Sequence, residues 1–208
     1  MKKDNIRLIV SIAVAACLWT LMFSPMTSGF FNFWGMMSVS AALLFTLATV
    51  SGVKWWREIC LDWKNVIIGV ALAAALWGIF WTGDKVSSWM FGFAREQVDM
   101  IYGIKSGISP VLLSVLLLLL IGPAEEIFWR GYVQRTLADR IGKNAGFLVA
   151  TAIYACVHIP SWNFMLVMAA LVAGAVWGLA YRLCPGKFGA IVISHALWDA
   201  AVFVWFPV

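Results

Sequence analysis

The sequence predicts an all-α protein that crosses a membrane as a bundle of about seven helices, with its N-terminus in the cytoplasm. Its 208 residues are 63% hydrophobic and only 12% charged. A soluble globular domain carries roughly 25% charged residues and under about 50% apolar ones. Apolar runs of the length that crosses about 30 Å of hydrocarbon follow one another along the chain. No repeat, low-complexity tract or linker divides these runs, so one integral-membrane domain is expected.

The first apolar run, Leu8–Phe23, follows the basic start Met1–Arg7 and is expected to be the first transmembrane helix. A signal peptide begins in the same way, but the residues after Cys17 stay apolar, whereas a mature secreted protein turns polar there. Six further spans are expected at approximately Phe30–Val50, Asn65–Thr82, Pro110–Gln134, Ala145–Ile159, Phe164–Arg182 and Phe188–Phe206.

Basic residues are distributed unevenly between the segments that join these spans. Cytoplasmic loops carry an excess of Lys and Arg, so the bias predicts that the N-terminus is inside and the C-terminus outside. The longest expected loop, Gly83–Ser109, contains Val86–Ala94, which either lies flat on the outer surface as an amphipathic segment or simply connects two spans. In this topology only Lys85, Arg95 and Lys105 are outside, and the inner side holds Lys2, Lys3, Arg7, Lys54, Arg57, Lys64, Arg130, Arg135, Arg140, Lys143, Arg182 and Lys187.

The net charge of +5 would suit a nucleic-acid partner, but the basic residues are scattered between apolar runs and act as topology signals instead. The expected partner is therefore the lipid bilayer, and no nucleic acid is expected. The four cysteines form no CxxC pair, so they indicate neither a disulfide framework nor a zinc knuckle. They are Cys17, Cys60, Cys156 and Cys184.

Few ionisable side chains are predicted to lie at membrane depth, where each one is costly. Of the ten acidic residues, only Glu125, Glu126 and Asp199 fall within apolar spans. Both histidines of the chain, His158 and His195, also do so. These five groups belong to three different spans. If these side chains were far apart, each would be an ionisable group without a partner in the membrane, which costs free energy. If they surround one cavity, they form a functional site.

The spacing of these groups favours convergence. Glu126 and Arg130 are four residues apart, so they share a helix face and are expected to form an ion pair. Glu125 is turned by about 100° from Glu126 and is left free to point elsewhere. The same four-residue step separates Tyr154 from His158 and His195 from Asp199.

Two further local patterns affect how the helices meet. Gly122-Pro123 is expected to loosen or kink the fourth span, because proline removes a backbone donor and clashes with the preceding turn. Such a kink would admit water to Glu125. Gly174 and Gly178 form a small-xxx-small pattern that lets helices approach closely.

Three motifs in the second half of the chain carry a family resemblance. Glu125-Glu126-x-x-x-Arg130 resembles the EExxxR motif of the CAAX protease and bacteriocin-processing (CPBP) family of intramembrane proteases. Tyr154-x-x-x-His158 is similar to the second motif of that family, FxxxH, with Tyr in place of Phe. His195-x-x-x-Asp199 is similar to the last, HxxxN or HxxxD. The match spans about residues 110–207, and residues 1–109 resemble the family only in being hydrophobic spans.

The resemblance implies that the protein hydrolyses a peptide bond within the membrane. By analogy with the family, Glu125 and His158 would hold and deprotonate the attacking water. His195 would face the oxyanion, and Asp199 would either donate to the oxyanion when protonated or orient His195 when ionised. Glu126 and Arg130 would brace the helix that presents Glu125.

Several features are left open by the sequence. Two histidines and one or two carboxylates are a donor set that can hold zinc with an open position, but the HExxH spacing is absent, so a metal-independent glutamate mechanism is favoured. A proton-coupled carrier would also bury such residues, although the chain lacks the repeats that carriers often show. A catalytically silent immunity or scaffolding relative is a third alternative.

The expected organisation is three N-terminal helices and an outer loop over residues 1–109, followed by a four-helix catalytic core over residues 110–208. The expected substrate is a membrane-associated protein, cut in a C-terminal or leader tail, and the expected location is a bacterial inner membrane. At about 1.5 Å per residue, Glu125 lies nearer the inner face and His158, counted from Ala145, nearer the outer one. Either the fifth span begins earlier, within Arg140–Asn144, or the helices are tilted or broken.

Overall fold

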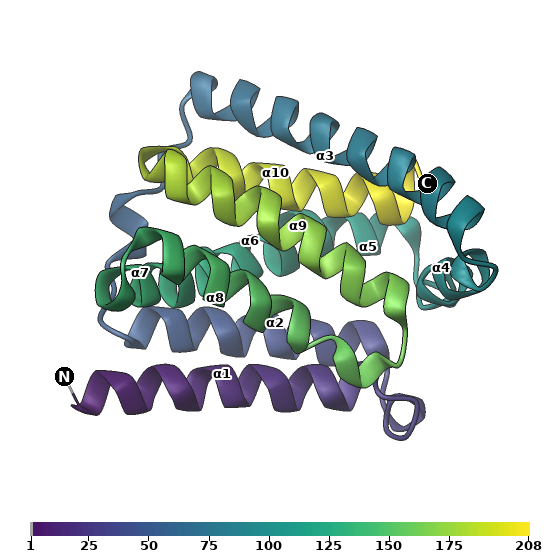
Figure 1. Ribbon diagram of the computed structural model, residues 1–208, viewed down its shortest axis with the longest axis horizontal. Coiled ribbons are helices and arrows are strands. Elements are labelled where there is room, and N and C mark those ends of the chain that lie inside the picture. Colours follow the sequence, from purple (N-terminus) through teal and green to yellow (C-terminus); the bar gives the residue numbers. More distant parts are fainter. Residues whose placement is uncertain (1) are drawn as a thin grey trace.

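The structure is a computed structural model that describes residues 2–208, and all its regular elements over that range are helical (Figure 1). Seven of its helical segments are long and apolar enough to cross a membrane. The all-α fold and the number of spans are therefore confirmed, and the chain is an integral membrane protein. The seven segments are Asp4–Phe23, Phe33–Val50, Trp63–Met90, Pro110–Ile141, Lys143–Ser161, Phe164–Leu183 and Pro185–Trp205.

The described residues form ten α-helices and three π-helical segments, and all of these except α4 belong to the seven spans. The α-helices are α1 (Lys2–Phe23), α2 (Phe33–Val50), α3 (Trp63–Met90), α4 (Ala94–Gly103), α5 (Pro110–Leu116), α6 (Gly122–Glu126), α7 (Arg135–Ile141), α8 (Lys143–Cys156), α9 (Phe164–Leu183) and α10 (Phe188–Ala200). The π-helical segments are Leu117–Ile121, Ile127–Gln134 and Ala201–Trp205.

The fourth span departs from α-helical geometry on both sides of the Glu125-Glu126 pair. The chain stays helical through the predicted kink at Gly122-Pro123, but the segments before and after α6 are π-helical. π-Helical turns have i→i+5 hydrogen bonds, which makes them wider than α-helical turns, and they often occur at functional sites. Both carboxylates therefore lie in a five-residue α-helical piece between two widened ones.

The predicted outer loop at Gly83–Ser109 is wrong in its first part. The helix α3 continues to Met90, so most of Val86–Ala94 is the last turn of a transmembrane helix and neither a separate surface segment nor a plain loop. Asp84 lies within this longer helix. In the structure this side chain is buried and lies 3.3 Å from both Lys85 Nζ and Arg95 Nη1, which allows the helix to continue past it.

The fifth span begins earlier than expected. The helix α8 begins at Lys143, two residues before the expected start at Ala145, and ends at Cys156. His158 follows the end of this helix and precedes the short turn Ile159–Ser161. The earlier start within Arg140–Asn144 is therefore confirmed, and the end of α8 before His158 also fits the alternative of a broken helix.

Two glycines allow the helices around the site to approach closely. A Cβ atom on Gly122 would lie 2.8 Å from Ala196 Cα, which means that α6 packs directly against the backbone of α10. A Cβ atom on Gly174 would lie 2.9 Å from Tyr154 Cδ1, so α9 packs directly against this side chain of α8. The predicted close approach at the Gly174 pattern is thus present.

Replacing Gly122 with Ala is expected to destabilise the protein by about 1–3 kcal/mol, because the added methyl group has only backbone to displace. Gly78 is a matched control, since it lies in the membrane helix α3 with no atom within 4 Å of a built Cβ. Gly78→Ala is expected to be neutral or slightly stabilising, because alanine favours the helix. Thermal unfolding in detergent measures both variants, and an unchanged midpoint for Gly122→Ala would contradict the proposed close contact.

Candidate active site

A cavity of about 450 Å³ lies within the helical bundle and brings the predicted catalytic side chains together. Its lining includes Glu125, His158, His195 and Asp199, which come from three different spans. Each of these side chains is buried. The polar groups are surrounded by aromatic and aliphatic side chains, so the site is a small polar cluster in an otherwise apolar cavity.

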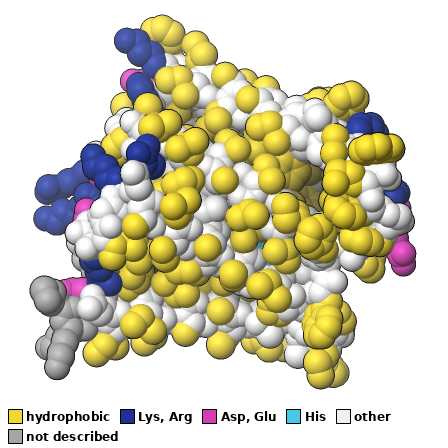
Figure 2. All heavy atoms as spheres, in the orientation of Figure 1, with side chains coloured by type: hydrophobic (Ala, Val, Ile, Leu, Met, Phe, Trp, Pro, Cys, Tyr) yellow, Lys and Arg dark blue, Asp and Glu magenta, His cyan; other side chains and the backbone are white. Residues whose placement is uncertain are grey.

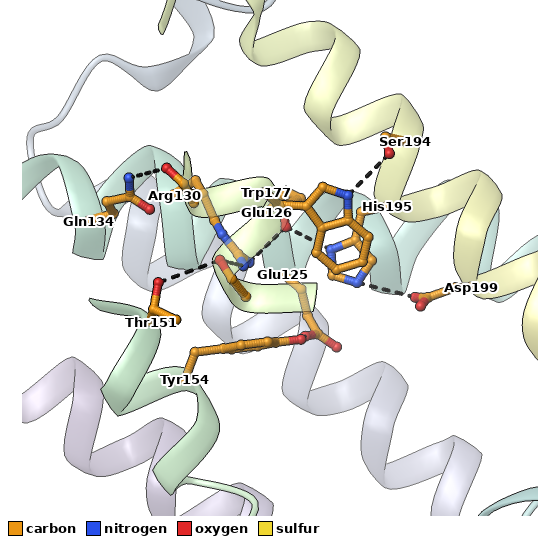
Figure 3. A network of polar contacts seen from close by, with 12 residues as sticks. Glu125, Glu126, Arg130, Gln134, Thr151, Tyr154, Trp177, Ser194, His195 and Asp199 are labelled. Carbon is orange, nitrogen blue, oxygen red and sulfur yellow. Dashed lines mark hydrogen bonds and ion pairs between the residues drawn. The ribbon is translucent and has the colours of Figure 1, made fainter. Parts of the chain in front are cut away.

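Glu125 is separate from the ion pair made by its neighbour. Its Oε2 atom accepts a hydrogen bond of 3.3 Å from the hydroxyl of Tyr154, and the two side chains meet in Figure 3. Tyr154 also lines the cavity. Glu125 therefore has one neutral donor beside it, and no basic side chain of the described residues forms a salt bridge with it.

Glu126 is fully buried and holds two partners on one oxygen. Arg130 Nη1 donates to its Oε1 at 2.7 Å, as the four-residue spacing predicts, and His195 Nδ1 lies 2.8 Å from the same atom. Its other oxygen, Oε2, has no hydrogen-bond partner within the described residues. Arg130 also donates to the carbonyl of Gly174 at 3.2 Å and lies 4.8 Å over the ring of Tyr154. These contacts tie the fourth span to α8, α9 and α10.

His195 lies between two carboxylates and against an indole (Figure 3). Its Nδ1 faces Glu126, and its Nε2 lies 3.4 Å from Asp199 Oδ2. The ring of Trp177 stacks on the imidazole with centroids 3.9 Å apart and planes tilted by 16°. The indole N–H of Trp177 is in turn bonded to Ser194 Oγ at 3.1 Å. The orientation of His195 is therefore fixed from three sides, and Asp199 lies where it can orient the ring.

Both ring nitrogens of His158 are also engaged. Its Nδ1 lies 2.8 Å from the carbonyl oxygen of Tyr154, and the indole Nε1 of Trp19 donates to its Nε2 at 3.0 Å. A carbonyl can only accept, and an indole N–H can only donate. This pair of partners fixes the neutral tautomer with the proton on Nδ1 and the lone pair on Nε2.

Three residues in or near the site were not predicted from the sequence. Trp19 donates to His158, Trp177 stacks on His195, and Gln134 Nε2 joins the fourth span to α9 by donating to the carbonyl of Gly178 at 2.8 Å. Gln134 lies four residues after Arg130, so the same helical spacing that pairs Glu126 with Arg130 could have predicted a place for it on that helix face. Trp19 gave none, because it lies 139 residues from His158 in a helix that resembles any apolar span.

The donor set does not fit a metal ion in this arrangement. No group of three or more His, Cys, Asp or Glu side chains within residues 2–208 is arranged to hold one. The lone pair of His158 is directed at Trp19, and both nitrogens of His195 face carboxylates. A zinc site of two histidines and a carboxylate would require both rings to leave these partners.

Comparison with known proteins identifies the part of the chain that contains the cluster. Residues 107–201 match the family model described as type II CAAX prenyl endopeptidase Rce1-like. No curated protein and no solved structure was found to match the chain. The family implies a CAAX-protease-type intramembrane endopeptidase with a membrane-associated substrate. Residues 107–201 are therefore a segment of the Rce1-like, or CPBP, family, as the three motifs predict.

Proposed function

We propose that the protein is a glutamate-dependent endopeptidase that cuts a membrane-associated protein in a C-terminal or leader tail. The observation that supports this proposal is that Glu125, His158, His195 and Asp199 line one cavity while Glu125 lies outside the Glu126–Arg130 ion pair. An ionisable side chain at membrane depth without a cation beside it is costly, which favours a functional role. The steep charge bias of the loops further supports a bacterial inner membrane as the location.

In the proposed reaction Glu125 takes a proton from a water molecule in the cavity. The resulting hydroxide attacks the carbonyl carbon of the scissile peptide bond, and the carbonyl oxygen becomes an oxyanion. The protonated Glu125 then gives its proton to the amide nitrogen as the carbon–nitrogen bond breaks. The products are a new carboxylate and a new amine. General base catalysis of this kind contributes about 10²–10⁴-fold to a rate.

The oxyanion needs a donor, and His195 is the proposed one. Its Nε2 lies 3.4 Å from Asp199 Oδ2, and the His195 ring lines the cavity, so an N–H on Nε2 would face an oxyanion bound beside Asp199. Asp199 and Glu126 orient the ring, and Arg130 balances the charge of Glu126. Preorganised donors of this type are worth about 10²–10³-fold in kcat.

Trp19 donates to Nε2 of His158 while the carbonyl of Tyr154 faces its Nδ1, so these two bonds hold the neutral His158 ring in place at the cavity wall. Trp19→Phe removes one hydrogen bond and is expected to lower kcat about tenfold, equivalent to about 1.4 kcal/mol. Trp77→Phe is the matched control, because it also removes an indole-to-partner bond, to the carbonyl of Phe206, but lies away from the cavity. Equal activity of the two variants would show that the Trp19 bond does not serve catalysis.

The proposal is tested with purified protein in proteoliposomes and a set of quenched-fluorescence peptides of about 20 apolar residues. Wild-type protein is expected to release fluorescence, and His158→Ala is expected to release none while unfolding as wild type does. A proton-coupled carrier would instead acidify the vesicles without cutting any peptide. Peptide cleavage retained in both His158→Ala and Glu125→Ala would end the peptidase proposal.

A further inference from the structure

We propose that the cavity takes its substrate from the non-cytoplasmic half of the bilayer, through a lateral opening between α3 and α9. The substrate class would then be an apolar segment of a protein that has been inserted into or carried across the membrane. This inference rests on the proposed peptidase function and specifies where its substrate comes from.

The first support is the position of the cavity along the bundle. The helices α1, α3, α8 and α10 line the cavity with residues near their C-terminal ends. The helices α2 and α9 line it with residues toward their N-terminal ends. Neighbouring spans run in opposite directions, so these ends lie together on one side of the molecule (Figure 1). The helix α4 and the connection after it add Val98, Ile101, Tyr102 and Ile104 to the same side. The cavity is thus confined to one half of the bundle.

The second support is the charge on the opposite side. Figure 2 shows most of the Lys and Arg side chains of this face gathered at the edge where α1 begins, far from α4. In the predicted topology that side has eleven basic residues besides the buried Arg130, and the cavity side has three, which makes the cavity side non-cytoplasmic.

The three basic residues on the cavity side are all engaged within the protein. Arg95 contacts Asp84 at 3.3 Å and Asp99 at 2.7 Å, and Lys85 contacts Asp84 at 3.3 Å. Lys105 Nζ donates to the carbonyl of Phe203 at 3.1 Å. The cavity side therefore has only three basic residues, each held by a contact within the protein, and the bias toward the opposite side stands.

The third support is where the cavity opens. Large side chains that both line the cavity and are exposed mark its rim, and these are Ile79, Val86 and Met90 in α3 and Phe164 in α9. Figure 2 shows the surface hollowed in this region, among hydrophobic side chains. We call this gap the lateral opening. Its rim is apolar and lies on membrane helices, so it suits an apolar chain that arrives from the lipid.

Gly83 provides a direct test of this route. It lies in α3, lines the cavity and is exposed, and a Cβ built on it has no atom within 4 Å. Gly83→Trp therefore places a large ring at the lateral opening without a backbone clash. It is expected to raise KM for the apolar peptide probe about tenfold, or about 1.4 kcal/mol, with kcat changed less than about twofold. Gly78→Trp on the same helix is the control, because Gly78 has equal space but does not line the cavity.

The side of the membrane is tested separately by thiol labelling in intact cells. In a full-length variant with the four native cysteines replaced by alanine, Glu96→Cys marks α4 and Lys64→Cys marks the start of α3, and both positions are exposed. A membrane-impermeant maleimide is expected to label Glu96→Cys in intact cells and Lys64→Cys only after permeabilisation. The opposite pattern would overturn the proposed side, and equal KM values for Gly83→Trp and Gly78→Trp would overturn the route. Either result leaves the peptidase proposal standing, which fails only if wild-type protein cuts no peptide or if both His158→Ala and Glu125→Ala still cut it.

Discussion

Replacing Glu125 with Gln is expected to lower kcat by about 10³-fold while the protein keeps its fold. Glutamine has the size of glutamate and still accepts the hydrogen bond from Tyr154 at 3.3 Å. It cannot take a proton from water, so the step that creates the nucleophile is lost. Because Glu125 forms no salt bridge with any described residue, the substitution leaves no buried cation behind. Turnover of the apolar peptide probe in proteoliposomes measures the effect.

Two comparisons make this result specific. Thermal unfolding of Glu125→Gln is expected to match that of wild type, which separates loss of chemistry from loss of folded protein. Glu96→Gln removes a carboxylate from the exposed part of α4 and is expected to leave kcat and KM unchanged. If Glu125→Gln retained more than about one tenth of the wild-type kcat, a general base at this position would be ruled out.

The spans and the members of the polar cluster could be predicted from the sequence because both depend on short-range patterns. A run of about 20 apolar residues is a membrane helix wherever it folds, and an ionisable residue inside such a run needs a partner. The pairing of Glu126 with Arg130 follows from helix geometry alone. The membership of Glu125, His158, His195 and Asp199 in one site rested on the ordered motifs and on the small number of buried charges.

What could not be predicted depends on contacts between distant segments. The bond from Trp19 to His158 joins the first and fifth spans, and no local pattern distinguishes this tryptophan from those at helix ends. The extension of α3 to Met90 depends on Asp84 being matched by Arg95 from another helix. The contact of Glu126 with His195 likewise required the close approach of α6 and α10 at Gly122, which hydropathy does not encode.

Replacing Arg130 with Met is expected to destabilise the protein by about 3–5 kcal/mol, the usual cost of leaving one partner of a buried ion pair without the other. The Arg130 side chain is 3% exposed and Glu126 is fully buried, so water cannot replace the lost partner. The variant also loses the bond to the carbonyl of Gly174. Unfolding by denaturant in detergent micelles measures the free energy of unfolding.

The same substitution at an exposed pair provides the control. Arg95 and Asp99 have the same four-residue spacing and the same 2.7 Å separation, but their side chains are 50% and 61% exposed. Arg95→Met is therefore expected to cost no more than about 1 kcal/mol.

The double variant Arg130→Met with Glu126→Gln separates charge balance from packing. If the cost of Arg130→Met comes from the unpaired Glu126 carboxylate, removing that charge should restore part of the stability, since an uncharged replacement of a buried pair is often nearly neutral. If the double variant is as unstable as the sum of the single ones, the contacts of Arg130 with Gly174 and with the ring of Tyr154 account for the loss instead. In either case Glu125→Gln should leave stability unchanged, because Glu125 has no part in the ion pair. This difference in stability between two adjacent carboxylates tests the assignment of Glu125 to the chemistry and of Glu126 to its support.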